Sequence, residues 1–264
     1  MIVPIADPAD PRVTPYVAVR ERDLVGRQGG FIAEGEVVLR VLLGGRGRCR
    51  AASVLVAENR LARLAPLLAA APDETPVYVA TQTVMDAITG FHIHRGILAH
   101  GVRPVDPGAA ALLARLPARA LVMALFGVAN HDNMGGLFRN AAAFGADAVL
   151  IDPGCCDPLY RKAIRVSVGA ALTVPFARLA PGEDALALLA DAGIMALALS
   201  PAGAAPVSTL VRPERVAVLL GAEGPGLPPE LLAHARTVAI PMAAGWDSLN
   251  VVAASAVVLH QLTC

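Results

Sequence analysis

Residues 216–227 read VAVLLGAEGPGL, an apolar run that passes directly into a glycine-rich turn. The run VAVLL carries no polar side chain, which is typical of a strand buried on both faces of a sheet. Gly221, Gly224 and Gly226 follow it, and glycines beside a strand end let the backbone approach a ligand closely. Glu223 stands among them, although a turn needs no glutamate. The stretch therefore predicts a buried strand with a ligand-binding turn at its carboxyl end.

Apolar runs of the same kind recur along the second half of the chain. They lie at residues 121–126, 148–151, 195–199 and 238–240. Helical patterns separate them, at residues 132–145, 157–168 and 183–192, with a short helix from Pro228 and a last helix over 249–262. Apolar strands that alternate with helices predict a parallel sheet covered on both faces, so the expected fold class is α/β.

The first half predicts a smaller α/β unit. A strand or turn leads into a helix over residues 30–43, further strands are expected at 52–57 and 77–80, and helices at 60–70 and 83–88. Residues 1–28 have an irregular pattern. The sequence RPVDPG at 103–108 has the composition of a linker. We therefore expect an N-terminal domain over residues 1–103, a linker over 104–118 and a second domain over 119–264.

Composition excludes several classes of protein. Of the 264 residues, 55% are hydrophobic and 17% charged, which indicates a folded chain with a sizeable core. The apolar stretch 251–259 is shorter than the roughly 20 residues of a membrane-spanning helix. The N-terminus lacks a basic region followed by an apolar run, so no signal peptide is expected. The four cysteines form no CxxC pair, which predicts neither a disulfide framework nor a zinc site and fits a reducing cytoplasm.

Charge is distributed unevenly, although the formal net charge is zero. Residues 1–119 hold 14 Arg against 11 Asp or Glu, a net +3, and residues 120–264 hold 8 Arg or Lys against 11 Asp or Glu, a net −3. A basic bias of the N-terminal half is compatible with RNA contact. It is equally compatible with an arginine preference that reflects genome composition alone.

Two further stretches carry polar residues at positions where strands meet helices. NHDNMGGLFR, residues 130–139, follows a predicted strand and opens a helix that Asp132 is expected to cap. Free backbone N–H groups at a helix start bind anions, and the Arg139 guanidinium can donate two parallel hydrogen bonds to a phosphate. The alternative is a capped helix with a solvent-facing arginine.

IPMAAGWDSLN, residues 240–250, precedes the last helix. Asp247 or Ser248 is expected to cap that helix, which places Asn250 in its first turn, where asparagine is a poor helix former. Core packing explains the small apolar residues of the helix but leaves Asn250 without a structural reason. Asn250 is therefore a candidate functional residue.

Taken in their order along the chain, residues 130–139, 221–227 and 240–250, the three stretches resemble the signature motifs of a known family. This is the SpoU (TrmH-like) family of RNA 2′-O-ribose methyltransferases, in the SPOUT superfamily. The matching residues are Asn133, Gly135 and Arg139; Gly221, Glu223 and Gly226; and Ile240, Pro241, Met242, Ser248, Leu249, Asn250 and Val251. Two departures occur, since Ala244 stands where the family has glycine and Val252 where it often has a small polar residue. The segments FIAEGEVVLR and HRGILAH look like the ribosomal-protein-like RNA-binding domain that precedes this catalytic domain.

The resemblance implies an α/β catalytic domain with a deep trefoil knot, acting as a homodimer with its site near the interface. It implies S-adenosylmethionine as cofactor, bent and held largely by backbone groups, and a ribose 2′-hydroxyl of tRNA or rRNA as the methyl acceptor. The expected cofactor-binding residues are Leu199, Gly221, Glu223, Gly226, Ile240, Met242, Ser248 and Leu249.

The resemblance also implies catalytic roles. Arg139 is expected at the attacking hydroxyl and its neighbouring phosphate, with Asn133, Ser248 and Asn250 orienting the arginine and the ribose. Glu223 would hold the loop or the arginine. Because the pKa of arginine lies above about 12, we expect Arg139 to anchor phosphate and stabilise developing negative charge while the proton leaves to phosphate or water.

One predicted helix carries three basic residues, Arg161, Lys162 and Arg165. These side chains either contact RNA or form a solvated charged face. His92 and His94 lack an evident third ligand, so no metal site is expected.

Two other functions stay open. A nucleotide-cofactor oxidoreductase is disfavoured by the missing GxGxxG, and a non-catalytic RNA-binding protein of the same fold is disfavoured by the presence of Arg139, Glu223, Ser248 and Asn250 together.

Overall fold

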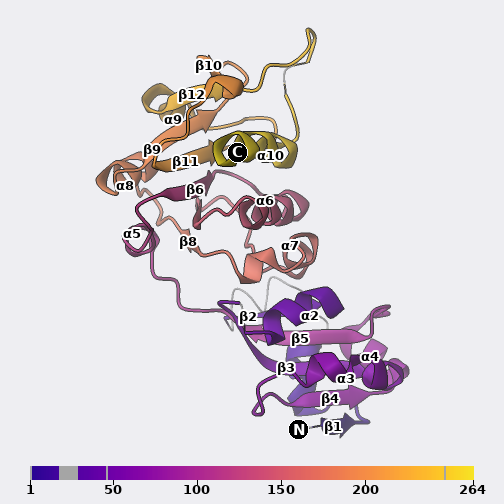
Figure 1. The fold of residues 1–264 in the computed structure, drawn as a ribbon. Helices are drawn as coiled ribbons and strands as arrows, with labels where there is room; N and C mark the ends of the chain where they lie inside the picture. The colour runs from indigo at the N-terminus through magenta and orange to yellow at the C-terminus, as the bar shows by residue number, and fades with distance from the viewer. Residues whose placement is uncertain (1, 18–28, 46, 247) are drawn as a thin grey trace. The chain divides into compact units, whose positions relative to one another are not determined.

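A computed structural model describes residues 2–17, 29–45, 47–246 and 248–264 (Figure 1). The chain forms two compact units. Unit 1 comprises Met1–Pro104 and Asp157–Thr173, and unit 2 comprises Val105–Cys156 and Val174–Cys264. The sequence-based boundaries place residues 157–173 in the second domain, whereas their contacts place them in unit 1. The assignment of functional domains stays a prediction.

The described residues of unit 2 build a seven-stranded sheet in which every pair is parallel. Its strand order is β10 (Ala205–Pro206), β12 (Arg236–Ala239), β9 (Met195–Leu199), β11 (Arg215–Leu220), β6 (Ala120–Leu125), β7 (Ala148–Ile151) and β8 (Phe176–Arg178). The central strands β6, β7 and β11 are buried almost throughout, as their apolar sequences predict. The predicted α/β fold with a parallel sheet is confirmed.

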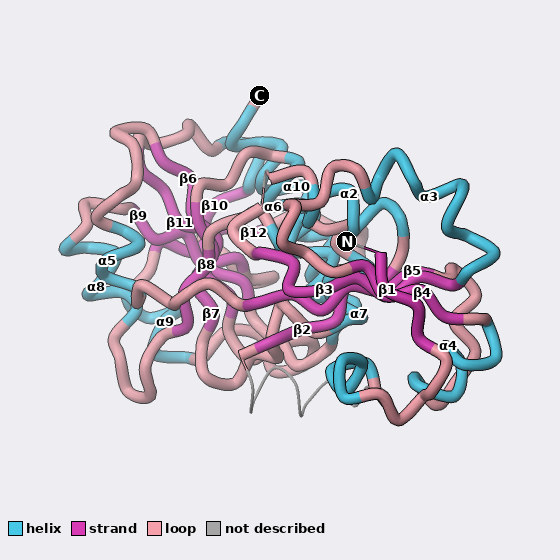
Figure 2. The backbone as a smooth tube through the Cα atoms, turned by 90° about the horizontal axis from the view of Figure 1, so that it is seen from below, coloured by secondary structure: helices cyan, strands magenta, loops and turns pink. Residues whose placement is uncertain are grey.

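Helices cover both faces of this sheet. In Figures 1 and 2, α5 (Ala109–Leu113), α8 (Ala185–Asp191) and α9 (Pro229–His234) lie on one side of the strands. Both views place α6 (His131–Ala143) and α10 (Val251–Thr263) together on the other side. Successive side chains of a strand point to opposite faces, so each strand needs apolar residues throughout.

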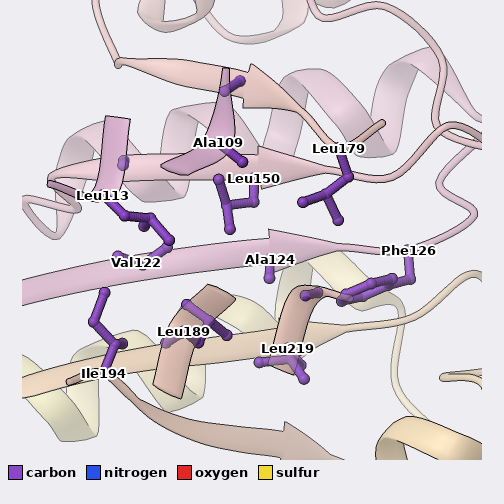
Figure 3. Packing of buried hydrophobic residues seen from close by; sticks show 14 of the residues in the cluster. Ala109, Leu113, Val122, Ala124, Phe126, Leu150, Leu179, Leu189, Ile194 and Leu219 are labelled. Carbon is purple, nitrogen blue, oxygen red and sulfur yellow. The ribbon is translucent and has the colours of Figure 1, made fainter. Parts of the chain in front are cut away.

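Figure 3 shows the core beneath α5 and α8. Val122 and Ala124 of β6 lie between Leu150 of β7 and Leu219 of β11, and Leu113 of α5 and Leu189 of α8 pack in the same cluster. Helix α5 falls inside the predicted linker, where no helix is expected from the sequence pattern. Its Ala109 and Leu113 are almost fully buried, so this part of the linker belongs to the core.

The helix caps differ from the prediction. Asn130, not Asp132, is the N-cap of α6, and its side chain accepts hydrogen bonds from the backbone N–H groups of Asp132 and Asn133. Asn250, not Ser248, is the N-cap of α10, and its Oδ1 accepts from Val252 N at 2.9 Å. Asp247 lies outside the described residues. Asparagine is among the best N-cap residues although it is poor inside a helix, so the cap position suits both asparagines.

Unit 1 contains a mixed sheet in the order β1 (Ile2–Ile5), β4 (Val77–Ala80), β3 (Arg50–Ala57), β5 (Ile97–Val102) and β2 (Gly30–Glu34). Strand β1 pairs in parallel with β4, although the sequence predicts irregular structure there. The helices are α2 (Glu36–Leu43), α3 (Leu61–Leu68), α4 (Gln82–Thr89) and α7 (Arg161–Val166). Short 3-10 helices occur at Pro11–Tyr16, Glu58–Arg60 and Ala170–Leu172 in unit 1, and at Val207–Thr209 in unit 2.

Among the described residues, no helix has the length and apolar character needed to cross a membrane. All four cysteines are described and none forms a disulfide. Burial raises the pKa of the Cys49 thiol to about 11 and that of the Cys155 thiol to about 12. The trefoil knot stays a prediction.

Candidate active site

A pocket of about 530 Å³ opens at the carboxyl ends of three neighbouring strands of unit 2, β9, β11 and β12. This volume lies within the usual range of ligand sites, and strand ends of this kind are where open parallel sheets bind ligands. The walls combine apolar side chains with exposed backbone. The lining residues are Leu199 to Pro201, Leu220 to Leu227, Leu232, Ile240, Met242, Ser248 to Val251, and Ala254.

The turn after β11 is folded tightly against itself. A Cβ built on Gly221 would lie 2.1 Å from the carbonyl carbon of Gly226, a distance at which the backbone itself must move. Gly226 N donates to Ala222 O at 3.1 Å, and Gly224 and Gly226 have φ of +88° and +71°. Glycine adopts such φ values without strain. The glycines therefore keep this wall of the pocket at the level of the backbone.

All eight residues predicted to bind a cofactor line this one pocket: Leu199, Gly221, Glu223, Gly226, Ile240, Met242, Ser248 and Leu249. Their roles stay predictions. Ser200, Pro201 and Leu232 also line the pocket and are not among the residues predicted from the sequence. Ser200 and Pro201 directly follow a predicted strand that ends at the same edge of the sheet, and that position was the available signal.

A hydrogen-bonded chain of side chains joins the three motifs. Asn250 Nδ2 donates to Glu223 Oε1 at 2.5 Å and to Asn133 Oδ1 at 3.1 Å. The other end of the same amide, Oδ1, accepts from Val252 N. Because both of its ends are engaged, the Asn250 side chain has one defined orientation. It fixes the carboxylate of Glu223 relative to the start of α6 and the start of α10.

Arg139 does not line the pocket of its own chain. It is exposed on α6, whereas Asn133 on the same helix is 8% exposed and contacts Asn250. Six residues along a helix correspond to a rotation of roughly 240°, so the two side chains leave α6 on different sides. The structure thus brings Asn133, Glu223, Ser248 and Asn250 to one place and leaves Arg139 outside that group.

Residues 120–260 match the model of the SpoU rRNA Methylase family, which is more than half of the chain. This chain belongs to the SpoU rRNA Methylase family. An uncharacterized tRNA/rRNA methyltransferase, Mb0905 of Mycobacterium bovis, is 39% identical over 268 residues, covering 98% of this chain and 91% of that protein. The protein Rv0881 of Mycobacterium tuberculosis, with the same description, has the same identity and coverage.

Solved structures share the fold of this SpoU family member. An AdoMet-bound rRNA methyltransferase from Sinorhizobium meliloti superposes with a TM-score of 0.81 at 22% identity, covering 99% of this chain and 97% of that one. An RNA 2′-O ribose methyltransferase superposes with a TM-score of 0.77 at 24% identity, covering 98% of both chains. At these identities the likeness concerns the fold.

One residue that departs from the family pattern, Val252, packs against a glycine of the neighbouring helix. Val252, which stands where SpoU proteins often have a small polar residue, packs on Gly136 of α6. A Cβ on Gly136 would lie 2.7 Å from both methyl groups of Val252. Asn140, one helical turn further, donates to Val252 O and to Ser255 Oγ, both at 2.8 Å. This packing holds the N-terminus of α10 against α6 and so keeps Asn250 beside Asn133.

Replacing Gly136 with alanine is expected to lower the free energy of unfolding by about 1–3 kcal/mol, because the new methyl group overpacks against Val252. In a protein that already carries Val252→Ala, the same Gly136→Ala change should cause no loss. Relative to that background it should add about 1 kcal/mol of stability, because alanine has the higher helix propensity. Urea unfolding of both single variants and the double variant measures this coupling. Strictly additive effects would contradict the contact.

The other predicted residues lie in unit 1. Arg161 and Arg165 approach Glu34 at 2.6 Å and 3.8 Å, and Lys162 is exposed on the same helix. The rings of His92 and His94 meet edge to face at 4.5 Å. Across the described parts of the chain, no group of three or more His, Cys, Asp or Glu side chains is arranged to hold a metal ion.

Proposed function

We propose that this protein transfers the methyl group of S-adenosylmethionine to a ribose 2′-hydroxyl of tRNA or rRNA. The observation that carries the proposal is the meeting of three motifs. Glu223, Asn133 and Asn250 are widely separated in the sequence and are joined by hydrogen bonds at the edge of one pocket. Membership of the SpoU family supports RNA as the substrate, as does the naming of the mycobacterial relatives as tRNA/rRNA methyltransferases.

The pocket fits S-adenosylmethionine. Gly221 lets the turn close onto the backbone of Gly226, Gly226 leaves open space that a side chain would fill, and the apolar walls come from Leu199, Ile240 and Leu249. Such a combination of apolar walls and a few polar backbone groups is usual for nucleoside cofactors. When bound, S-adenosylmethionine supplies an electrophilic methyl group on a sulfonium centre. The AdoMet-bound structures of the same fold support this choice.

The side chains around the pocket would act chiefly by positioning. Alignment of reacting groups can contribute up to about 7–11 kcal/mol, which exceeds what one proton transfer supplies. Asn250, held at both ends of its amide, would keep Glu223 and Asn133 fixed while the ribose is oriented. Ser248 lines the pocket and would face the same substrate.

Arg139 would bind the phosphate beside the target ribose and stabilise charge that develops on the 2′-oxygen, with the proton leaving to phosphate or water. Arginine stays protonated at neutral pH, which suits it to this role and not to that of a base. The family homodimer, with its site near the interface, is part of the proposal. The exposed position of Arg139 outside its own pocket supports it.

The remaining elements of the proposal follow from the family resemblance. The C-terminal unit would carry a trefoil knot, unit 1 would contribute to RNA binding, and the protein would work in the reducing cytoplasm. The ribose specificity draws support from the fold shared with an RNA 2′-O ribose methyltransferase.

Mass spectrometry of RNA tests the function. Unmodified tRNA and rRNA transcripts incubated with the protein and S-adenosylmethionine should yield a 2′-O-methylated nucleoside and a phosphodiester resistant to alkali at one site. A methyl group on a base instead would contradict the ribose specificity. RNA binding without any methyl transfer would favour the non-catalytic alternative, and binding of NAD in place of S-adenosylmethionine would favour the oxidoreductase.

Exchanging Asn250 for serine separates its two tasks. Serine is an equally good N-cap, so the melting temperature should stay near that of the wild type, whereas Asn250→Ala should lose about 1 kcal/mol of stability. Serine is too short to bridge Glu223 and Asn133, so methyl transfer should fall by up to roughly 100-fold in both variants. Full activity of Asn250→Ser would show that the helix cap is the only task of this residue.

A further inference from the structure

Five arginines of unit 1 gather around one short segment of the chain. The segment is Glu34-Gly35-Glu36, which joins the end of β2 to the start of α2. The arginines come from four separate stretches of sequence, and we name them the arginine cluster: Arg40, Arg63, Arg95, Arg161 and Arg165. Arg40 and Arg95 lie in the two segments that resemble an RNA-binding domain, and Arg161 and Arg165 lie on the predicted charged helix. The structure adds Arg63 and brings all five to one segment.

Glu34 holds the two arginines of α7. Its Oε2 lies 2.6 Å from Arg161 Nη1 and 3.8 Å from Arg165 Nη1. The Glu34 side chain is only 10% exposed, whereas those of Arg161 and Arg165 are 22% and 41% exposed. The carboxylate therefore lies beneath the two guanidinium groups, and the charge nearer to solvent is positive.

Glu36 holds a second pair in the same way. Its oxygens lie 3.0 Å from Arg40 Nη2 and 2.8 Å from Arg63 Nη2. Arg40 and Arg63 are about twice as exposed as Glu36, at 67% and 69% against 34%. These ion pairs lower the pKa of the Glu36 carboxyl, chiefly through the hydrogen bond from Arg63. Two guanidinium groups on one carboxylate leave N–H donors available for a further anion.

Arg95 completes the cluster between the two pairs. Gly35 has a φ of +93°, and a Cβ there would lie 2.6 Å from Arg95 Nη1, so the arginine side chain lies across the glycine. Four residues earlier, Phe91 is 40% exposed, and its ring centroid lies 5.0 Å from the guanidinium carbon of Arg161. Among the described residues, the cluster carries five positive charges and contacts two carboxylates, with an aromatic ring at its edge.

We propose that the arginine cluster is a docking surface for the phosphate backbone of the RNA substrate, with Phe91 placed for an unpaired base. Arginine forks match phosphate geometry, and exposed aromatic rings beside arginines are typical of single-stranded RNA contacts. The inference rests on the proposed function, since it takes RNA as the substrate. It also gives a role to α7, which lies within the family match of residues 120–260 yet completes a surface of unit 1.

The test uses the full chain and a fluorescein-labelled, unmodified tRNA transcript, with affinity measured by anisotropy between about 50 and 200 mM salt. The double variant Arg40→Gln/Arg63→Gln removes two highly exposed charges of the cluster and leaves buried Glu34 paired. We expect its affinity to fall roughly 10-fold and the slope of log K against log salt to decrease by about 1.5. Arg40→Lys/Arg63→Lys should restore most of the slope, because the charges return.

The matched control is Arg12→Gln/Arg50→Gln. Both arginines belong to unit 1 and are exposed, but they lie away from the cluster: Arg12 pairs with Asp10, and Arg50 begins β3. This control should change neither affinity nor slope by more than about a tenth of the effect of the cluster variant. Equal behaviour of the two double variants would overturn the proposal, as would competition by polyglutamate as effective as that by unlabelled RNA.

Methyl transfer, measured in parallel, separates this inference from the proposed function. If the wild type methylates RNA and the cluster variant binds RNA normally, the docking surface is wrong and the function stands. If RNA binding depends on the cluster but the wild type transfers no methyl group to any tRNA or rRNA, the function is wrong and the surface stands.

Discussion

Arg139→Ala should reduce methyl transfer to RNA by roughly 100- to 1,000-fold, the usual loss when one group that stabilises developing charge is removed. S-adenosylmethionine should bind this variant with unchanged affinity, because Arg139 does not line the pocket. The folded state should also be unaffected, since the side chain is exposed. Radiolabelled methyl incorporation and calorimetric titration with S-adenosylmethionine provide the two readouts.

Two further variants sharpen this prediction. Arg139→Lys keeps the charge but loses the planar fork, so its activity should lie between those of the wild type and the alanine variant. Arg115→Ala removes another exposed arginine of unit 2 and should leave turnover unchanged. Wild-type turnover by Arg139→Ala would refute the role assigned to this residue.

Gly221→Ala should abolish S-adenosylmethionine binding. The new Cβ would lie 2.1 Å from the backbone of Gly226, and a contact with backbone cannot be relieved by turning a side chain. The turn between residues 221 and 227 must shift, and it supplies a whole wall of the pocket. A displacement of about 1 Å at a site of this kind costs roughly 100-fold in rate, and methyl transfer should fall at least that far.

The matched control for this substitution is Gly154→Ala. Gly154 also lies in a loop of unit 2, but a Cβ there makes only ordinary contacts, at 3.4 Å and beyond. It should keep the melting temperature and cofactor affinity of the wild type. Because the 221–227 turn begins beyond the carboxyl end of β11, the strands of the sheet should stay paired, and circular dichroism should show Gly221→Ala folded. Normal cofactor affinity of that folded variant would mean that the pocket serves another ligand.

Much of unit 2 is predictable from sequence because its strands are buried on both faces. Strands β7 and β9 have the bounds that their apolar runs predict. Strand β6 differs from its predicted run by one residue at each end, and β11 by one residue at its start. The period of hydrophobic residues decides such elements locally. Strand β1 and helix α5 escaped prediction because both are short, and pairing or packing with distant segments decides their structure.

The candidate site also has a part that the sequence predicts and a part that it does not. The order of the motifs, together with the family resemblance, predicts which segments meet, and Leu199, Gly221, Ile240 and Leu249 do line one pocket. The sequence does not reveal that Asn250 is a helix cap whose amide also reaches Glu223 and Asn133, because those bonds depend on three-dimensional placement. Nor does it show Val252 complementing Gly136, or arginines from distant segments surrounding Glu34 and Glu36.

A structure of the protein determined with S-adenosylmethionine tests the central claim most directly. The account predicts the cofactor in the pocket at the carboxyl ends of β9, β11 and β12, enclosed by residues 220–227, 240–242 and 248–251. Cofactor bound at any other place on the chain, or a pocket still empty at saturating concentration, would contradict it.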